Sequence, residues 1–410
     1  MSENRYDVVV YGATSFVGQI LVRYLSEAYG VDGELKWAAA GRSQRKLESV
    51  REGLGERAAK LPLIVADAAD EQALEQMCAQ TRVVISTVGP YALYGEPLVR
   101  VCARGGTDYC DLTGEVQWIR RMITRYEADA RNSGARLVHC CGFDSIPSDM
   151  GVHFLQQQMQ ARHGAPASRV KMRVRAMRGG MSGGTVASLM NVMREASADK
   201  DLRRELADPY SLCPPDHDFS VKQPSVQSSQ YDSDFGAWLA PFVMAPINTR
   251  VVLRSHALAG APWGADFRYD EAMLTGRGVK GRLAAFSVSA SSTLFMLAAA
   301  LRPTRWVLER FVVPKPGEGP SPQAQEQGFY DLRLLGKTAD GKTLRAKVTG
   351  DRDPGYGSTA KMLGQAGACL AQDLGKKDLA GGFWTPSTAL GDALRERLTG
   401  HAGLTFEILD

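Results

Sequence analysis

The chain has 410 residues, more than one hydrophobic core usually organises, so two domains are expected. Its composition, 44% hydrophobic and 23% charged, is ordinary for a soluble globular protein. A net charge of +4 is small for this length, and the absence of any lysine–arginine block excludes a typical nucleic-acid-binding protein.

The N-terminus carries a pattern typical of dinucleotide-binding folds. Asp7 to Tyr11 predicts a buried strand, a glycine turn follows, and an apolar helix is expected from Phe16 to Ala28. The first glycine permits a tight turn, the last lets the helix pack closely on the strand, and the helix start favours a pyrophosphate. A serine replaces the middle glycine of a G-x-x-G-x-x-G pattern. We expect the cofactor to contact Gly12, Ala13, Thr14, Ser15, Phe16, Val17 and Gly18.

The next two strands are expected to meet the adenosine end of the cofactor. The strand from Leu35 to Ala40 ends in Gly41, Arg42 and Ser43. An acidic residue at this place binds the 2′-hydroxyl of NAD, whereas an arginine pairs with the 2′-phosphate of NADP. Arg42 with Ser43 therefore favours NADP, although a solvated basic helix start is the plain alternative. Asp67 ends the third strand, near the expected adenine.

The fourth strand, from Arg82 to Thr87, runs into Val88, Gly89 and Pro90. At the carboxyl end of a central strand this loop should pass the nicotinamide ribose. Tyr91 follows as an anchor or a proton donor. A Gly-Pro-Tyr sequence also occurs as an ordinary turn between elements, so this motif alone is weak evidence for a cofactor site.

Two further strands lead to the same edge of the sheet. The fifth, within Thr107 to Glu115, carries Tyr109 and Asp111, and a helix is expected from Val116 to Asn132. The sixth, from Ala135 to Cys140, leads to Asp144 and Ser145 at the strand exit, where chemistry usually lies. Ser148 and Asp149 are interpreted as helix N-cap residues. Six alternating strands and helices predict a complete doubly wound domain by about residue 150.

The middle of the chain follows a different pattern. Arg169 to Met177 alternates polar and apolar residues, which predicts a half-exposed strand. The glycine-rich stretch from Gly179 to Thr185 is interpreted as a substrate-side loop before a helix from Val186 to Ala198. Pro209 to Asp234 is expected to be an excursion or loop.

The last part predicts a hairpin, two helices and a strand. Phe329 to Leu335 and Thr343 to Thr349 read as strands of a hairpin. Helices are expected from Thr359 to Gln372 and from Ser387 to Leu398. A final strand, from Leu404 to Leu409, is expected to return with the last helix to the first domain.

Leu283 to Leu301 holds nineteen residues without a charge, between Arg282 and Arg302. It is nearly long enough to span a bilayer, but four serines, one threonine and six alanines dilute its hydrophobicity. We expect a buried helix or an interfacial segment rather than a membrane span. Peripheral contact with lipid through residues 283–301 is therefore left open.

The seven cysteines show no C-x-x-C pair, and no His-x-x-x-His cluster accompanies them. No metal site is expected, and the thiols are interpreted as reduced and mostly buried in a cytoplasmic protein. The N-terminus runs directly into the first strand, which leaves no room for a signal peptide.

Four motifs in the first 150 residues combine in one pattern: Tyr11-Gly-Ala-Thr-Ser-Phe-Val-Gly18, Ser86-Thr-Val-Gly-Pro-Tyr91, Asp108-Tyr-Cys-Asp-Leu-Thr-Gly-Glu115 and Cys141-Gly-Phe-Asp-Ser-Ile-Pro-Ser-Asp149. Together they resemble the saccharopine dehydrogenase-like oxidoreductases. Gly183-Gly-Thr185 and the stretch from Gly355-Tyr356 to Thr359-Ala360 resemble the branch of trans-acting enoyl reductases. The similarity extends over nearly the whole chain.

This resemblance implies an α/β protein with three segments. Residues 1–150 would form a doubly wound, Rossmann-type NADP-binding domain with a parallel sheet. Residues 151–357 would form a second α+β domain with a mixed or antiparallel sheet, for substrate binding or dimerisation. Residues 358–410 would return to the first domain, and a homodimer is left open.

The resemblance also implies NADPH-dependent reduction of an α,β-unsaturated acyl group, often on a lipid or polyketide-like chain held by a carrier. Candidate proton donors are Tyr91, Tyr109 and Ser145, and Asp111 and Asp144 could orient them or tune their pKa values. Each of the five could equally be a turn, cap or core residue.

Two other functions are kept as alternatives. A saccharopine-type imine reductase would need arginines for the substrate carboxylates, for which Arg169, Arg173, Arg175 and Arg178 are candidates. A non-catalytic NADP-binding protein would dock on a lipid surface through the apolar segment. Turnover with a panel of enoyl and imine substrates discriminates among the three functions.

Overall fold

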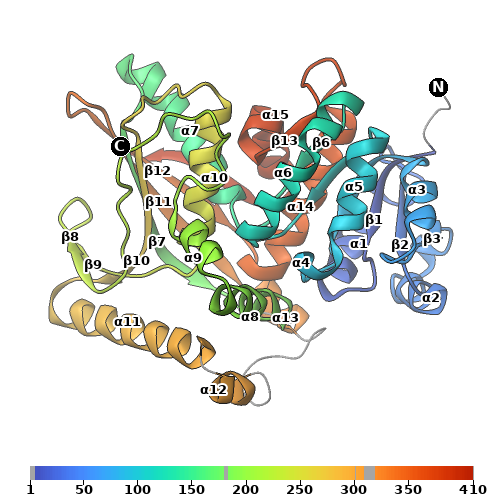
Figure 1. Cartoon of the computed structure of the whole chain (residues 1–410), viewed down its shortest axis with the longest axis horizontal. Coiled ribbons are helices and arrows are strands. Elements are labelled where there is room, and N and C mark those ends of the chain that lie inside the picture. Colours follow the sequence, from blue (N-terminus) through green and yellow to red (C-terminus); the bar gives the residue numbers. More distant parts are fainter. Residues whose placement is uncertain (1–4, 180–182, 301, 309–318, 410) are drawn as a thin grey trace. The chain divides into compact units, whose positions relative to one another are not determined.

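The structure is a computed structural model, shown in Figure 1, and it describes residues 5–179, 183–300, 302–308 and 319–409. Contacts divide the chain into two compact units. The first comprises residues 1–146, 317–319 and 355–403, and the second comprises residues 147–316, 320–354 and 404–410. The chain therefore passes between the units more than once.

The first unit is built on a seven-stranded parallel sheet with the order β13-β6-β5-β4-β1-β2-β3. Val8, Val9 and Val10 in the central strand are completely buried, as expected for a parallel strand covered on both faces. The strands are β1 (Tyr6–Tyr11), β2 (Trp37–Gly41), β3 (Leu63–Val65), β4 (Thr81–Ser86), β5 (Asp108–Asp111), β6 (Arg136–Val138) and β13 (Gly382–Trp384).

Helices cover this sheet, and one of them, α14, comes from the end of the chain. It packs on β1, β4 and β5 beside α1, where Gln365 hydrogen-bonds Tyr24 and Tyr29. The alternation of strands and helices, with the order 3-2-1-4-5-6 in the sheet, confirms the predicted Rossmann-type domain. The helices are α1 (Phe16–Tyr29), α2 (Gln44–Gly53), α3 (Glu71–Cys78), α4 (Tyr91–Tyr94), α5 (Glu96–Gly105), α6 (Val116–Ser133), α14 (Thr359–Gln372) and α15 (Pro386–His401).

The second unit is built on a mixed sheet with the order β14-β12-β11-β7-β10-β9-β8. Strands β7 and β10 are parallel, and the other neighbouring pairs are antiparallel. This confirms the predicted mixed sheet and the hairpin of β11 and β12. The strands are β7 (Arg169–Arg178), β8 (Gln230–Asp232), β9 (Ala237–Ala240), β10 (Arg268–Gly276), β11 (Phe329–Lys337), β12 (Thr343–Gly350) and β14 (Leu404–Leu409).

The helices of this unit are of two kinds. Buried residues occupy most of α10, which packs on β10, whereas α11 lies along β9 and β10 at the edge of the unit (Figure 1). The helices are α7 (Ile146–His163), α8 (Gly183–Ala198), α9 (Lys200–Ala207), α10 (Ala245–Leu258), α11 (Gly278–Ala300), α12 (Arg302–Val307) and α13 (Pro322–Glu326).

The final strand and one helix start differ from the sequence predictions. Strand β14 pairs with β12 in the second sheet instead of returning to the first, because Thr405 hydrogen-bonds Thr349 and Phe406 packs on Phe154 of the same unit. Ser148 and Asp149 are not N-cap residues, since α7 already begins at Ile146. The carboxylate of Asp149 accepts a hydrogen bond from the Ser255 hydroxyl at 2.5 Å, which explains an acidic residue at this buried position.

The burial of the apolar segment also differs from one of the two expectations. Only 17% of the window from Gly278 to Ala299 is buried, so α11 is not a core helix. Among the described residues it is the one helix that has the length and mean hydropathy, 1.3, needed to cross a membrane. The fully buried residues of this helix are small, and Phe295 packs partly buried against Met190.

Candidate functional site

The turn between β1 and α1 favours glycine at Gly12 and at Gly18, in the first turn of α1. Gly12 has φ +90°, which side chains rarely adopt. A Cβ atom on Gly18 would lie 2.1 Å from the carbonyl oxygen of Gly12, so helix and strand meet at a distance that excludes any side chain. These are the two roles that a dinucleotide-binding turn assigns to its glycines.

Ser15 occupies the place of the middle glycine and acts as the N-cap of α1. Its hydroxyl accepts a hydrogen bond from the Gly18 N–H at 2.9 Å and lies 3.0 Å from the hydroxyl of Thr87. The Thr87 hydroxyl in turn donates to the Gly12 carbonyl at 2.9 Å. The serine thus connects the turn to the end of β4, and its preference for N-cap positions is a signal that the sequence alone contained.

An aromatic contact flanks the same turn. The ring of Phe16 meets the ring of Tyr356 edge to face, with centroids 5.0 Å apart. Tyr356 lies in a π-helical turn, Pro354–Ser358, that leads into α14. The sequence predicted Phe16 as a cofactor residue but did not connect it with Tyr356, since 340 positions separate the two.

Basic residues collect at the end of β2. Arg42 is exposed and makes no hydrogen bond or ion pair with any residue that the structure describes. Ser43 caps α2 by accepting a hydrogen bond from Lys46 N–H at 3.4 Å. Asp67 is exposed after β3 and accepts from Ala69 N–H at 3.0 Å. An unpaired guanidinium at this place fits the 2′-phosphate of NADP.

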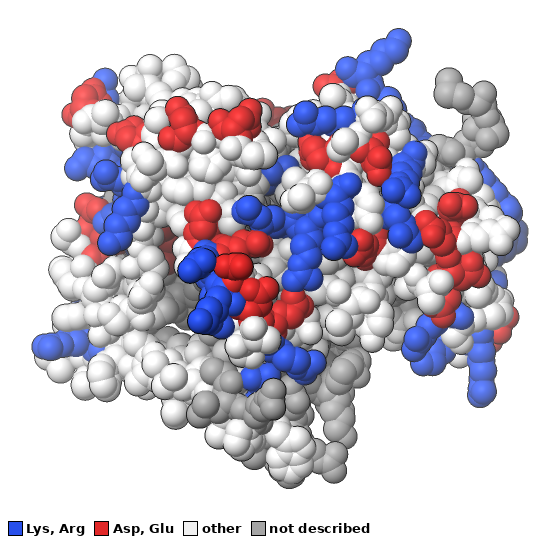
Figure 2. All heavy atoms as spheres, viewed as in Figure 1, with Lys and Arg blue, Asp and Glu red and all other residues white. Residues whose placement is uncertain are grey.

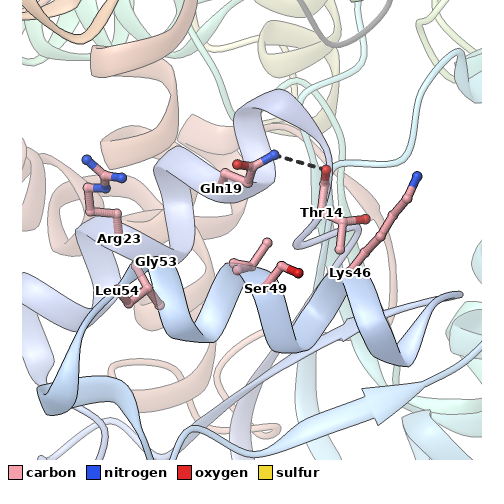
Figure 3. Close-up of a pocket in the computed structure, with 8 residues that line it drawn as sticks. Thr14, Gln19, Arg23, Lys46, Ser49, Gly53 and Leu54 are labelled. Carbon is pink, nitrogen blue, oxygen red and sulfur yellow. Dashed lines mark hydrogen bonds between the residues drawn. The ribbon is translucent and has the colours of Figure 1, made fainter.

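A side pocket of about 360 Å³ lies between α1 and α2 (Figure 3). Gln19 reaches across its upper side and donates to the Thr14 carbonyl at 3.2 Å. Of the predicted cofactor residues only Thr14 lines this pocket, so it is a flank of the turn and not the dinucleotide groove. Its walls are Thr14, Gln19, Arg23, Lys46, Ser49, Val50, Gly53 and Leu54.

The loop after β4 is accessible, but the tyrosine that follows it is not. Val88, Gly89 and Pro90 are partly or fully exposed, whereas Tyr91 is buried. The Tyr91 hydroxyl donates to the carbonyl of Ser86 at 2.9 Å, and burial raises its pKa well above the ordinary value. Its backbone N–H donates to the buried carboxylate of Glu115 at 2.8 Å, which holds the start of α4. Glu115 is a positioning residue that sequence reasoning missed.

Tyr109 and Asp111 belong to a buried network at the end of β5. The Tyr109 hydroxyl donates to Asp111 at 2.9 Å, and Nδ1 of His139 lies 2.7 Å from the same carboxylate oxygen. The second oxygen accepts from Thr113 N–H at 3.1 Å. Burial raises the pKa of Tyr109 far above its ordinary value. To act as a donor to substrate, either tyrosine would have to leave its partner inside the protein.

Asp144 differs from these residues. It lies in the turn between β6 and α7, is partly exposed, and makes no hydrogen bond or ion pair within the described chain. Burial of the carboxyl group raises its pKa to about 7. A carboxyl group that is partly exposed, has no hydrogen-bond partner within the described chain and has a raised pKa has the properties of a general acid.

The turn that carries Asp144 is held on both sides. The N–H of Phe143 donates to the Thr359 hydroxyl at the start of α14, at 2.9 Å. Ser145 is buried and has φ +111°, an unusual conformation for a residue with a side chain. Such backbone conformations collect at functional sites. The predicted site residues therefore follow strand ends at one edge of the sheet, with Tyr91, Tyr109 and Asp111 inside and Asp144 accessible.

Comparison with known proteins agrees with this geometry. Residues 8–138 match the family model of the saccharopine dehydrogenase NADP-binding domain. A Mycobacterium tuberculosis protein provisionally named as a trans-acting enoyl reductase is 42% identical over 410 residues, which cover 98% of this chain and 97% of the relative. Trans-acting enoyl reductases from Mycobacterium ulcerans and Mycobacterium bovis are 38% and 39% identical, each over 97% of this chain and over 96% and 97% of their own.

This chain belongs to the trans-acting enoyl reductase family.

The predicted resemblance is confirmed, and with it the cofactor and the class of enzyme. A protein of this family with a saccharopine dehydrogenase NADP-binding domain is an NADPH-dependent oxidoreductase. The turn at Gly12 and the unpaired Arg42 suit that cofactor. The fold is also that of apo saccharopine dehydrogenase (L-Glu forming) from Saccharomyces cerevisiae, with a TM-score of 0.53, 12% identity, and coverage of 99% of this chain and 100% of the yeast chain.

The arginines proposed for a saccharopine-type substrate are engaged elsewhere in this trans-acting enoyl reductase family member. Arg173 is 2% exposed and forms ion pairs with Asp232 and Asp270, both at 2.9 Å. Arg169 also pairs with Asp270. The two outer arginines also have partners in the chain. Arg175 forms an ion pair with Asp331 at 3.4 Å, and Arg178 donates a hydrogen bond to Gln327 at 3.3 Å. None of the four is left unpaired.

Two further expectations concern other parts of the chain. Within the predicted substrate-side loop from Gly179 to Thr185, residues 180–182 lie outside the described part of the chain, and Gly183, Gly184 and Thr185 are already the first residues of α8. In the described part, no group of three His, Cys, Asp or Glu side chains could hold a metal ion. None of the seven cysteines forms a disulfide, and six of them are buried.

Proposed function

We propose that this enzyme reduces the carbon–carbon double bond of an α,β-unsaturated acyl group on a lipid or polyketide-like chain, held as a thioester by a carrier. The observation that carries the proposal is the full-length similarity, at 38–42% identity, to proteins named trans-acting enoyl reductases. Because that similarity includes the second unit as well as the NADP-binding domain, it supports a shared substrate class. We place the reaction in the cytoplasm, in accord with seven cysteines that form no disulfide.

NADPH, when bound, supplies the hydride that is added to the β-carbon of the acyl group. The turn from Gly12 to Gly18 binds the pyrophosphate, and Arg42 with Ser43 binds the 2′-phosphate. Asp67 lies beside the adenosine, and Val88, Gly89 and Pro90 orient the nicotinamide ribose. The same turn also contributes Ala13, Thr14, Ser15, Phe16 and Val17 to the cofactor site. All thirteen assignments are proposals that rest on position at the carboxyl edge of the sheet.

Asp144 completes the addition by donating a proton to the α-carbon. In this proposal the acid form of Asp144 is the donor, because it is the accessible carboxyl group at the edge and its pKa is raised to about 7. Tyr91, Tyr109 and Asp111 hold the strand ends in place through their internal hydrogen bonds. Ser145 fixes the direction of the Asp144 turn. The products are the saturated thioester and NADP+.

The test is a substrate panel with the purified full chain. We expect NADPH oxidation with enoyl thioesters of pantetheine, and a saturated product that is heavier by two hydrogen atoms in mass spectrometry. An amino acid with a 2-keto acid should give none, because the arginines of β7 are paired. Turnover with the second pair alone would establish imine reduction instead. Stoichiometric NADPH binding without turnover on either would show a non-catalytic protein.

A further inference from the structure

The fully buried residues of helix α11 are small, Phe295 is partly buried against Met190, and the other large apolar residues named below point outward. Gly281, Ala285, Ser289 and Ala299 are buried against the unit, where the helix packs on β9, β10 and α8. The outward side chains are 59–74% exposed, and they recur at intervals of three, four and eight residues along one stripe: Val279, Leu283, Phe286, Leu294 and Leu297. A helix on a protein surface in water normally has the opposite arrangement.

The polar residues of this helix do not interrupt the stripe. The Ser289 hydroxyl donates to the Ala285 carbonyl at 2.8 Å, and Thr293 donates to Ser289 at 2.9 Å, so both hydroxyls are satisfied by their own helix. Beyond the helix, Trp306 in α12 is 60% exposed. Tryptophan in that position is typical of a membrane–water interface. In Figure 2 the visible surface along α11 is white, without red atoms.

The charged residues near the apolar stripe of α11 indicate what binds to it. No Asp or Glu occurs from residue 272 to residue 308, while Arg277, Lys280 and Arg282 are exposed around the first turn of the helix. A second copy of the chain, paired through α11 in either direction, would offer these basic side chains no acidic partner on the helix. Anionic lipid headgroups neutralise such charges.

We propose that α11 docks the protein on an anionic membrane surface, lying flat with its apolar stripe among the acyl chains. The helix cannot be surrounded by lipid, because Gly281 and Ala285 hold its inner face against the sheet. Its first residue follows β10 almost directly, which fixes that end to the unit. It therefore rests at the interface and does not span the bilayer. This inference does not depend on the enoyl reaction.

Vesicle co-sedimentation of the full chain tests the proposal. Binding to vesicles of phosphatidylcholine with phosphatidylglycerol should exceed binding to phosphatidylcholine alone by about tenfold or more, and high salt should reduce this preference. The triple variant Leu283→Gln, Phe286→Gln, Leu294→Gln should bind both at least about 100-fold more weakly. Val65→Gln, at an exposed valine of the other unit, is the matched control and should bind as wild type.

Further measurements on these variants distinguish lipid binding by α11 from binding of a second copy of the chain. Arg277→Glu with Lys280→Glu should remove most of the preference for anionic vesicles while the apolar contribution stays. Turnover on a soluble short-chain thioester and the melting temperature should match wild type in all variants, because the replaced side chains are exposed. Equal vesicle binding by wild type and the triple variant overturns the proposal. So does a stable dimer in solution that the triple variant dissociates, since α11 would then bind a second copy.

Discussion

At the carboxyl edge of the first sheet, accessible polar residues are left without partners inside the described chain, as Arg42 and Asp144 show. The second unit shows the opposite arrangement, with its polar groups paired and its apolar groups exposed. The charged residues of β7 are paired even where they are buried, and large apolar side chains of α11 are exposed. Unpaired polar groups suit a charged cofactor and a proton transfer, whereas exposed apolar groups suit a surface without water.

A comparison of α11 with α14 makes the same point for helices. Both are rich in alanine and glycine, yet nearly every residue of α14 is buried and most of α11 is exposed. Apolar composition alone therefore does not decide burial. What decides it is whether neighbouring elements cover the helix on more than one side.

Replacing Asp144 tests the strongest claim about the first unit. Asp144→Asn should lower kcat for enoyl reduction by about 10²–10⁴-fold, because the amide cannot donate the proton, and should leave the Kd for NADPH unchanged. The raised pKa of about 7 means that the donating acid form is lost as the pH rises through 7. Wild-type kcat should therefore fall over that range in stopped-flow measurements, and the variant should lose this dependence.

Asp111→Asn provides the contrast for that experiment. It disturbs hydrogen bonds with Tyr109, His139 and Thr113, so it should lower the melting temperature, whereas Asp144→Asn should not. A wild-type rate and pH profile in Asp144→Asn would remove Asp144 as the acid. A loss of the pH dependence in Asp111→Asn at full stability would assign the role to Asp111.

Arg173 tests whether the charges of the second unit are structural. Arg173→Met should lower the free energy of unfolding by about 3 kcal/mol, because Asp232 and Asp270 lose a buried partner but keep Lys171 and Arg169. Urea denaturation measures the change, and KM for the thioester should not move. Arg175→Met on the same strand is the control and should cost less than about 1 kcal/mol, since its ion pair is exposed. A stable Arg173→Met with a raised KM would instead show a substrate-binding arginine.

Gly18 tests the close approach of helix and strand. Gly18→Ala places a Cβ atom 2.1 Å from the Gly12 carbonyl, so the turn must shift at a cost of about 1–3 kcal/mol. The Kd for NADPH, measured by fluorescence titration, should rise by about 5–150-fold. Gly105→Ala is the control, because no atom lies within 4 Å of its added Cβ. Unchanged NADPH binding in Gly18→Ala would show that the cofactor does not use this turn.

Replacing Arg42 should have the smallest of these effects, a change in the preference for NADPH over NADH. Arg42→Ala should raise the Kd for NADPH about tenfold, through loss of a charge-assisted hydrogen bond to the 2′-phosphate, and leave the weaker binding of NADH unchanged. Arg57→Ala, at another exposed arginine of the first unit, should affect neither coenzyme. Equal losses for both coenzymes would mean that Arg42 does not read the 2′-phosphate.

The sequence alone predicted six strands of the first sheet, the hairpin of β11 and β12 and many element limits, but not β13. The mixed second sheet was implied by the family resemblance. Parallel strands covered on both faces need continuous apolar runs, and their turns need glycine, so this information is local. The helix from Thr359 to Gln372 was predicted at its observed limits for the same reason. NADP was favoured correctly from one arginine at the end of β2.

Only the tertiary structure decided which strand ends are accessible and which helix is covered. Asp111 and Asp144 both follow strands and look alike in sequence, but His139, 28 residues after Asp111, occupies the first carboxylate and nothing described occupies the second. Strand β14 joined the second sheet through Thr349, and among the described residues α11 packs on β9, β10, α8 and α12 while its apolar stripe is left exposed. These outcomes depend on partners distant along the chain, which no local pattern contains.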